Sequence, residues 1–170
     1  FGDEKIQFER FDLTELVKGV LQSMELFAEQ KQAKVSFRQT EPLYVWGDEY
    51  KIEQVVRNYV SNAFNHLAGD MVVEVKIEVK DGIARTTVFN TGKPIPEEDI
   101  SHIWEKFYKV DKAHTREYGG NGIGLSIVKA IMESLHRKYG VENYDNGVAF
   151  WFELEVKWYA RNYDAVNCYA

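Results

Sequence analysis

Glycines and basic side chains gather in one segment of the chain, in a pattern that suits an anionic ligand. Residues 119–124 read Gly-Gly-Asn-Gly-Ile-Gly and lead directly into an apolar segment with helical periodicity. Glycine lets the backbone approach a ligand closely, and the free amides at a helix start attract negative charge. The preceding polar segment contains Lys109, Lys112, His114 and Arg116. This combination predicts a phosphate cradle at the beginning of a helix.

The glycine spacing excludes two common phosphate-binding motifs. No glycine occupies the third position of G-x-G-x-x-G, and no Gly-Lys-Ser/Thr follows as a Walker loop requires. A plain glycine-rich surface turn ahead of an ordinary helix stays open as the alternative at this point.

A second polar pattern lies on a predicted helix that starts at Asp48. Asn58, Asn62 and His66 recur every four residues along the border of its apolar stripe. At about 100° per residue, this polar row lies roughly 90° from the centre of the stripe, which suits the wall of a cleft. A solvated helix edge is the alternative. The stripe, expected to be buried, consists of Ile52, Val55, Val56, Tyr59, Val60 and Ala63.

Composition restricts the class of protein. The 170 residues are 45% hydrophobic, which is enough for one globular domain with its own core. Acidic residues outnumber basic ones by 27 to 21, which argues against nucleic acid as a partner. The single cysteine, Cys168, cannot form an internal disulfide, so we expect a reducing compartment.

The ends of the chain suggest a piece of a longer protein. It starts without methionine, so a membrane segment could precede it. No apolar run approaches the ~18–20 residues of a membrane span, and we expect no direct membrane contact by this piece. Residues 158–170 break the strand alternation and are interpreted as a C-terminal tail of unknown role, which leaves 1–157 as the domain.

The elements that must position these side chains follow from periodicity and turn signals. Predicted helices run from 13 to about 32, from the N-cap Asp48 onward, over 97–104 and over 124–138. Predicted strands cover 35–38 and 43–46, with weak alternation over 7–11, and hairpins join 71–79 to 83–89 and 139–144 to 147–156. The predicted fold class is α+β: a two-layer α/β sandwich in which three helices cover one face of a mixed, mainly antiparallel sheet.

Four segments resemble, in order, the motifs of one family. Residues 54–63 resemble its asparagine motif, 90–96 its first glycine motif, 104–108 its phenylalanine motif and 120–125 its second glycine motif. Over residues 8–157 the chain resembles the catalytic and ATP-binding domain of sensor histidine kinases of two-component systems, within the gyrase and chaperone ATPase superfamily. The resemblance implies a Bergerat-type ATP-binding fold with a long lid over ATP.

The resemblance also implies roles for individual residues. Asn62 matches the magnesium ligand, and Asn58 is expected to support the same ion and to act as a catalytic group; a neutral amide oxygen is a hard donor that suits Mg²⁺. Asn90 stands where most relatives carry the Asp that accepts a hydrogen bond from the adenine amino group. His66 stands where an aromatic side chain packs near adenine, and Asn65 where a phosphate-binding Lys is common.

The segment between the last two motifs supplies the expected lid. Lys109, the second catalytic candidate, is expected to pair with the ATP phosphates, with His114 and Arg116 as further basic groups. Backbone amides at the start of the following helix are expected to hold the phosphates. The implied ATP-binding positions are Asn58, Asn62, Asn65, His66, Asn90, Gly92, Ile95, Phe107, Tyr108, Lys109, His114, Arg116, Gly120, Gly122, Gly124 and Leu125.

The implied activity is binding of Mg-ATP and transfer of its γ-phosphate to a histidine on a dimerisation domain absent from this chain. Such transfer depends mainly on positioning and charge neutralisation. None of His66, His102, His114 and His136 has the family's acceptor context, so we expect the isolated chain not to autophosphorylate. Implied partners are that phosphoacceptor domain and a response regulator receiver domain, and the implied location is the cytoplasmic part of a membrane-embedded bacterial sensor.

Other activities of the superfamily stay open. A gyrase-like clamp would hydrolyse ATP, but it needs a glutamate base one turn before the magnesium asparagine. That residue is Asn58 here, and an amide cannot take a proton at neutral pH. The remaining alternatives are an ATP-dependent interaction module and a serine kinase of the anti-sigma-factor type; the phenylalanine motif and the long lid favour the histidine kinases.

Overall fold

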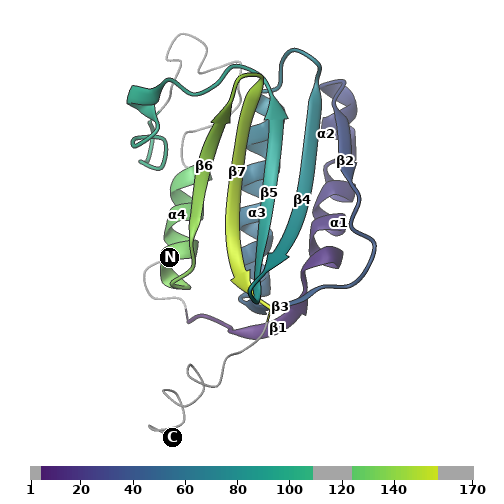
Figure 1. Ribbon diagram of the computed structural model, residues 1–170, viewed down its shortest axis with the longest axis vertical. Helices are drawn as coiled ribbons and strands as arrows, with labels where there is room; N and C mark the ends of the chain where they lie inside the picture. The colour runs from purple at the N-terminus through teal and green to yellow at the C-terminus, as the bar shows by residue number, and fades with distance from the viewer. Residues whose placement is uncertain (1–4, 109–123, 157–170) are drawn as a thin grey trace, which may run out of the picture.

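A computed structural model describes residues 5–108 and 124–156 of the chain (Figure 1). The α-helices are α1 (Leu13–Ser23), α2 (Glu25–Gln30), α3 (Glu49–Asn65) and α4 (Gly124–Ser134). The strands are β1 (Glu9–Asp12), β2 (Lys34–Phe37), β3 (Tyr44–Gly47), β4 (Val72–Lys80), β5 (Ile83–Thr91), β6 (Tyr139–Tyr144) and β7 (Gly147–Glu155). A 3₁₀ turn, η1 (Glu97–Asp99), follows β5.

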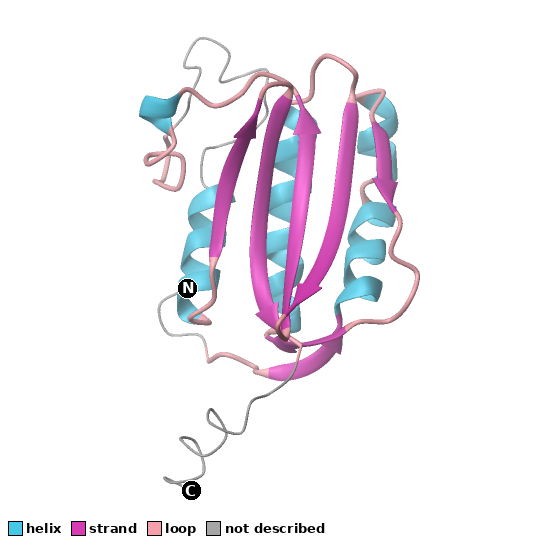
Figure 2. Ribbon diagram, viewed as in Figure 1, coloured by secondary structure: helices cyan, strands magenta, loops and turns pink. Residues whose placement is uncertain are grey.

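The strands form one seven-stranded sheet in the order β1-β3-β7-β5-β4-β2, with β6 also beside β7. β2 and β4 run parallel, and the other paired strands are antiparallel. The helices lie behind the sheet in Figure 1, and within the described residues no helix covers the face toward the viewer (Figure 2). The predicted two-layer α+β sandwich with a mixed, mainly antiparallel sheet is confirmed.

Helix α3 lies between α4 and α1 in the helical layer (Figure 1) and carries much of the core. Every residue of its predicted apolar stripe is buried, with an exposed fraction of 2% or less. Tyr59 packs against Phe150 and Phe152 of β7, and its hydroxyl donates a hydrogen bond to the carbonyl of Trp151 at 3.0 Å. Burial raises the pKa of this phenol. Burial of the stripe determines which side of α3 faces the sheet.

The first predicted helix, 13–32, is interrupted at Met24. This residue has φ −105° and ψ 12°, outside the helical region, and it separates α1 from α2. The hydroxyl of the preceding Ser23 donates to the carbonyl of Val20 at 2.7 Å, a local bond that competes with regular helix geometry. The apolar spacing continues through the break, so periodicity alone does not detect it.

Two other helix predictions are too long. The 97–104 segment forms only η1 followed by turns, and Ile103 is its only buried apolar side chain, so little burial supports a helix there. Helix α4 ends at Ser134 instead of 138, and His136 adopts a left-handed φ of 53°, as is common just after a helix. The strands predicted at 35–38 and 43–46 both form, although β2 pairs with β4 whereas β3 pairs with β1 and β7.

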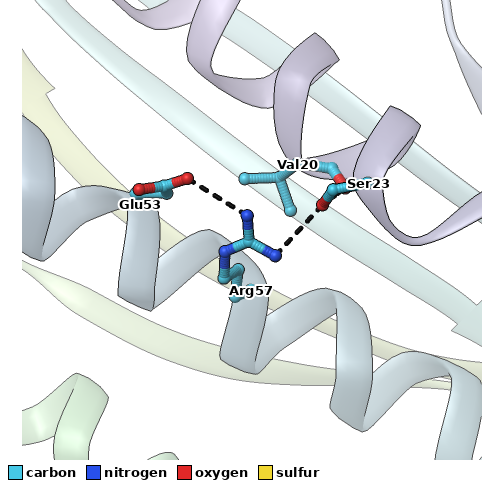
Figure 3. Close-up of polar contacts among 4 residues, drawn as sticks. All are labelled: Val20, Ser23, Glu53 and Arg57. Carbon is cyan, nitrogen blue, oxygen red and sulfur yellow. Dashed lines mark hydrogen bonds and ion pairs between the residues drawn. The ribbon is translucent and has the colours of Figure 1, made fainter.

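Two polar contacts hold α3 relative to the rest of the chain, one at its N-terminus and one near its middle. Asp48, 3% exposed, is its N-cap: Oδ1 accepts a hydrogen bond from the backbone N–H of Lys51 at 3.1 Å, and Oδ2 accepts one from Gln7 at 2.8 Å. Figure 3 shows Arg57 between Glu53 of its own helix, at 3.2 Å, and the hydroxyl of Ser23 in α1, at 3.0 Å. Because the Arg57 pair is partly exposed, the buried cap is the stronger of the two constraints.

We predict that Asp48→Ala lowers the free energy of unfolding by about 1–2 kcal/mol, since it removes the cap and the acceptor for Gln7. Asp48→Asn keeps one side-chain oxygen and is expected to lose about half as much. Urea unfolding followed by circular dichroism measures both variants. Equal stability of Asp48→Ala and the unmodified chain would contradict the role assigned to this cap.

Candidate functional site

Two segments that are distant in sequence contact the carboxyl-terminal half of α3. They are the end of β5 with the residues that follow it, and the start of α4. Asn58 and Asn62 of the predicted polar row are half-buried, as a position on the border of the apolar stripe requires, whereas His66 is exposed. Asn65 is half-buried as well. His66 is the C-cap of the helix. The predicted polar row therefore runs along one edge of α3, between α4 and β5.

At the first contact, Asn58 meets the start of α4. Its Nδ2 donates to the carbonyl of Gln54 at 2.9 Å, which orients the amide. Its Oδ1 lies 2.9 Å from the place where a Cβ on Gly124 would be, closer than side-chain carbons pack. Glycine at position 124 leaves this space to the Asn58 amide, which a side chain there would force to move. The amide oxygen of Asn58 is thus held beside the first residues of α4, Gly124 and Leu125.

At the second contact, the end of β5 meets the end of α3. Asn90 is 2% exposed, and its Nδ2 donates to the carbonyls of Thr91 at 3.1 Å and His66 at 3.4 Å. Gly92 has a φ of +156°, and a Cβ on it would lie 2.4 Å from the carbonyl of His66. Within the described residues, the Oδ1 of Asn90 accepts no hydrogen bond.

The loop after β5 is held by the turn between β6 and β7. The backbone N–H of Gly92 donates to the carbonyl of Asn146 at 3.0 Å. The side chain of Asn143 bonds to both backbone groups of Ile95, accepting from its N–H at 3.0 Å and donating to its carbonyl at 2.7 Å. The sequence analysis missed Asn143 and Asn146 and treated that turn as part of a hairpin only. No local signal marks these contacts, because they join segments about 50 residues apart.

Phe107 and Tyr108 are not brought to the asparagines. Phe107 is 70% exposed with a φ of 63°, and the hydroxyl of Tyr108 donates to Asp99 while its ring stacks on His102. Both residues belong to the segment around η1. The predicted lid residues Lys109, His114, Arg116, Gly120 and Gly122 lie outside the described residues, as does the predicted tail, 158–170.

The chemistry of the described part of the site is that of neutral donors and acceptors. Partial burial lowers the pKa of the His66 imidazole, which favours the neutral ring; the residue remains exposed overall, so the effect on stability is small. No group of three or more His, Cys, Asp or Glu in the described ranges could hold a metal ion.

No helix within the described residues is both long enough and apolar enough to cross a membrane.

Comparison with known families gives a match over most of the described chain. Residues 47–157 match the family model described as histidine kinase-, DNA gyrase B- and HSP90-like ATPase. A curated relative, the probable sensor kinase SilS of Salmonella typhimurium, is 36% identical over 102 residues, which make up 60% of this chain and 20% of SilS. The chain spans between 10% and 29% of the lengths of the curated relatives compared.

Solved structures match over a larger share of the chain. The nucleotide-free catalytic domain of histidine kinase ThkA has a TM-score of 0.76 and 32% identity, covering 88% of this chain and 95% of that one. ThkA in complex with the response regulator protein TrrA has a TM-score of 0.75 and 30% identity, covering 89% and 42%. Full-length ShkA in complex with AMPPNP has a TM-score of 0.76 and 25% identity, covering 89% and 31%.

The close backbone approach at the end of β5 predicts that Gly92→Ala is strongly destabilising. The added Cβ meets the His66 carbonyl in a backbone conformation that L residues rarely adopt, so we expect a loss of about 2–4 kcal/mol in unfolding free energy. Gly19→Ala is the matched control. It lies within α1 with nothing within 4 Å of its added Cβ, and it should stabilise the domain by up to about 1 kcal/mol. Thermal or urea unfolding distinguishes the two; similar effects of both changes would show that the contact at Gly92 is unimportant.

Proposed function

Because this chain belongs to the family of histidine kinase-, DNA gyrase B- and HSP90-like ATPases, and within it to the catalytic domains of histidine kinases, we propose that it binds Mg-ATP and presents the γ-phosphate to a histidine on another domain. One observation carries the proposal. Asn90 of β5 and the start of α4 both contact α3, the helix that carries the asparagine amides: Gly124 lies beside Asn58, and Asn90 donates to the carbonyl of His66.

The end of β5 suits recognition of the adenine base. The Nδ2 of Asn90 is directed to two backbone carbonyls, so the Oδ1 is the atom left to accept a hydrogen bond from an amino group. Gly92 permits close backbone approach there, and Ile95 and the neutral ring of His66 supply apolar surface near the same strand end. An Asn at position 90 can thus perform the acceptor role that an Asp has in most relatives.

The other end of the row suits a magnesium ion and phosphates. The amide oxygens of Asn62 and Asn58 are the proposed protein ligands of Mg²⁺ or of its waters, and Asn65 lies one turn further along. When bound, the ion neutralises phosphate charge. The first backbone amides of α4, at Gly124 and Leu125, are proposed to donate to phosphate oxygens at the start of the helix. Lys109, His114 and Arg116 are proposed to add positive charge from the lid.

Transfer to an external acceptor is better supported than hydrolysis. Hydrolysis of the gyrase type requires a carboxylate at position 58 to take a proton from water, whereas Asn58 is an amide whose Nδ2 donates to Gln54. Phosphoryl transfer requires mainly that the phosphate be held in position and its charge neutralised. The proposed acceptor is a histidine on a dimerisation domain of the longer protein.

Partners and location follow as proposals from the relatives. ThkA forms a complex with a response regulator, so we propose a receiver domain as the downstream partner of the protein that contains this chain. The relative SilS is named a probable sensor kinase, and we propose that this domain lies on the cytoplasmic side of a bacterial sensor embedded in the membrane.

The magnesium assignment predicts that Asn62→Ala weakens binding of AMPPNP by about tenfold or more when Mg²⁺ is present, because one amide ligand of the ion is lost. In EDTA the variant and the unmodified chain should bind alike. Isothermal titration calorimetry measures both conditions. Glu53→Ala, a change on the exposed side of the same helix, is the control and should leave affinity unchanged (Figure 3). Absence of nucleotide binding by the unmodified chain at millimolar concentration would contradict the proposed function.

The absence of a histidine in acceptor context predicts that the isolated chain does not phosphorylate itself. Incubation with γ-labelled ATP and Mg²⁺ should leave negligible label on the protein, since no acceptor is presented to the γ-phosphate. The measurement is label retained after gel electrophoresis at alkaline pH. Stoichiometric labelling of this chain alone is the result that would contradict transfer to a separate domain.

A further inference from the structure

We propose that Asn143, on β6, is a positioning residue for the adenine end of the site: it holds the loop 92–96 in the conformation in which Gly92 and Ile95 border the bound base. The proposal rests on the proposed function, since it assumes that an adenine nucleotide binds beside Asn90. Asn143 lies outside the four motifs that carry the family resemblance.

The side-chain amide of Asn143 bonds both backbone groups of Ile95, as the backbone of a neighbouring strand would. Its Oδ1 accepts from the N–H of Ile95 at 3.0 Å, and its Nδ2 donates to the carbonyl of the same residue at 2.7 Å. Both bonds have normal lengths and together close a ring, which determines the orientation of the amide. With the amide turned over, its NH₂ would face the N–H of Ile95 and its oxygen would face the carbonyl of Ile95. One side chain thereby fixes the backbone of Ile95 on both sides.

The loop needs such a partner because it can make few hydrogen bonds of its own. Pro94 and Pro96 have no backbone N–H, which prevents the segment from continuing β5. Of the N–H groups that remain, that of Gly92 bonds to Asn146 and that of Ile95 bonds to Asn143. Both anchors come from the β6–β7 hairpin. The hairpin therefore determines where the loop lies relative to the end of β5.

Sheet register places Asn143 in the same row as the proposed base acceptor. Asn90 of β5 pairs with Val148 of β7, and Val148 pairs on its other side with Asn143 of β6. Directly paired residues of antiparallel strands lie on one face of the sheet, so both asparagines face the helical layer. At about 4.8 Å per strand, they are roughly 10 Å apart. Asn143 thus lies two strands from Asn90, on the same face of the sheet as the proposed base acceptor.

A positioning role predicts a particular pattern of binding. Loss of the loop conformation should weaken contacts with the base and leave those with the magnesium ion and phosphates intact. Variants at Asn143 should therefore lose the same factor in affinity for ADP and for AMPPNP, with Mg²⁺ or with EDTA. This pattern differs from that of Asn62→Ala, whose effect is expected only in the presence of Mg²⁺.

The test compares Asn143→Ala, which removes both bonds, with Asn146→Ala as the matched control. Asn146 holds Gly92 through its backbone carbonyl, so removal of its exposed side chain should change affinity by less than about twofold. For Asn143→Ala we expect affinities about three- to tenfold weaker for ADP and AMPPNP alike, as measured by calorimetry. Affinities within twofold of the unmodified chain would overturn the proposal, as would a loss confined to the Mg²⁺ condition.

A second variant and a second measurement cover the case in which Asn143→Ala does not fold. Asn143→Asp keeps the acceptor for Ile95 N–H and loses the donor to its carbonyl, so an affinity between those of Asn143→Ala and the unmodified chain is expected. Amide hydrogen exchange at Ile95, followed by NMR without nucleotide, should be slow both in the unmodified chain and in Asn143→Asp, because each keeps a side-chain acceptor for that N–H. Rapid exchange at Ile95 in the unmodified chain overturns the clamp itself. Lack of nucleotide binding by the unmodified chain, with normal exchange protection at Ile95, would instead locate the failure in the proposed function.

Discussion

The contact between the end of α3 and the end of β5 is the constraint on which the candidate site depends. The carbonyl of His66 lies where a side chain on Gly92 would otherwise be, and it also accepts a hydrogen bond from Asn90. A helix leaves its last carbonyls without partners inside the helix, and here one of them is used to fix a strand end. The backbone at His66 and the backbone at Gly92 cannot shift relative to each other without losing this close contact and the hydrogen bond from Asn90. The proposed base site is thus defined by backbone geometry more than by side-chain conformation.

The same helix, α3, also positions the other parts of the candidate site. Asn58 and His66 are eight residues apart, about 12 Å along α3, and the start of α4 and the end of β5 contact those two positions. The helix is rigid because its apolar stripe is buried against the sheet and its N-terminus is capped by Asp48. One element therefore serves the core on one side and the site on its edge, and a change that tilts α3 affects stability and ligand geometry together.

Much of the fold and part of the site could be predicted because the signals are local. Asp81-Gly82 between two alternating segments predicts the β4–β5 hairpin, and Asp48 ahead of a periodic stripe predicts the start of α3; both are confirmed. The break at Met24 was not predictable, because the apolar spacing of α1 continues into α2. Asn143 was missed for a related reason: its bonds to Ile95 cross 48 residues, and an asparagine near a turn usually serves the turn itself.

The amino-acid sequence alone determined the types and approximate bounds of most elements, the buried side of α3 and the family, because periodicity, capping residues and ordered motifs are properties of short segments. Only the tertiary structure decided which segments touch: that β2 joins β4 in parallel, that Gly124 meets Asn58, and that the β6–β7 hairpin holds the loop after β5. The physical reason is that these contacts arise when several elements bury a common core. Their geometry depends on the packing of the whole sheet and its helices, which no single segment encodes.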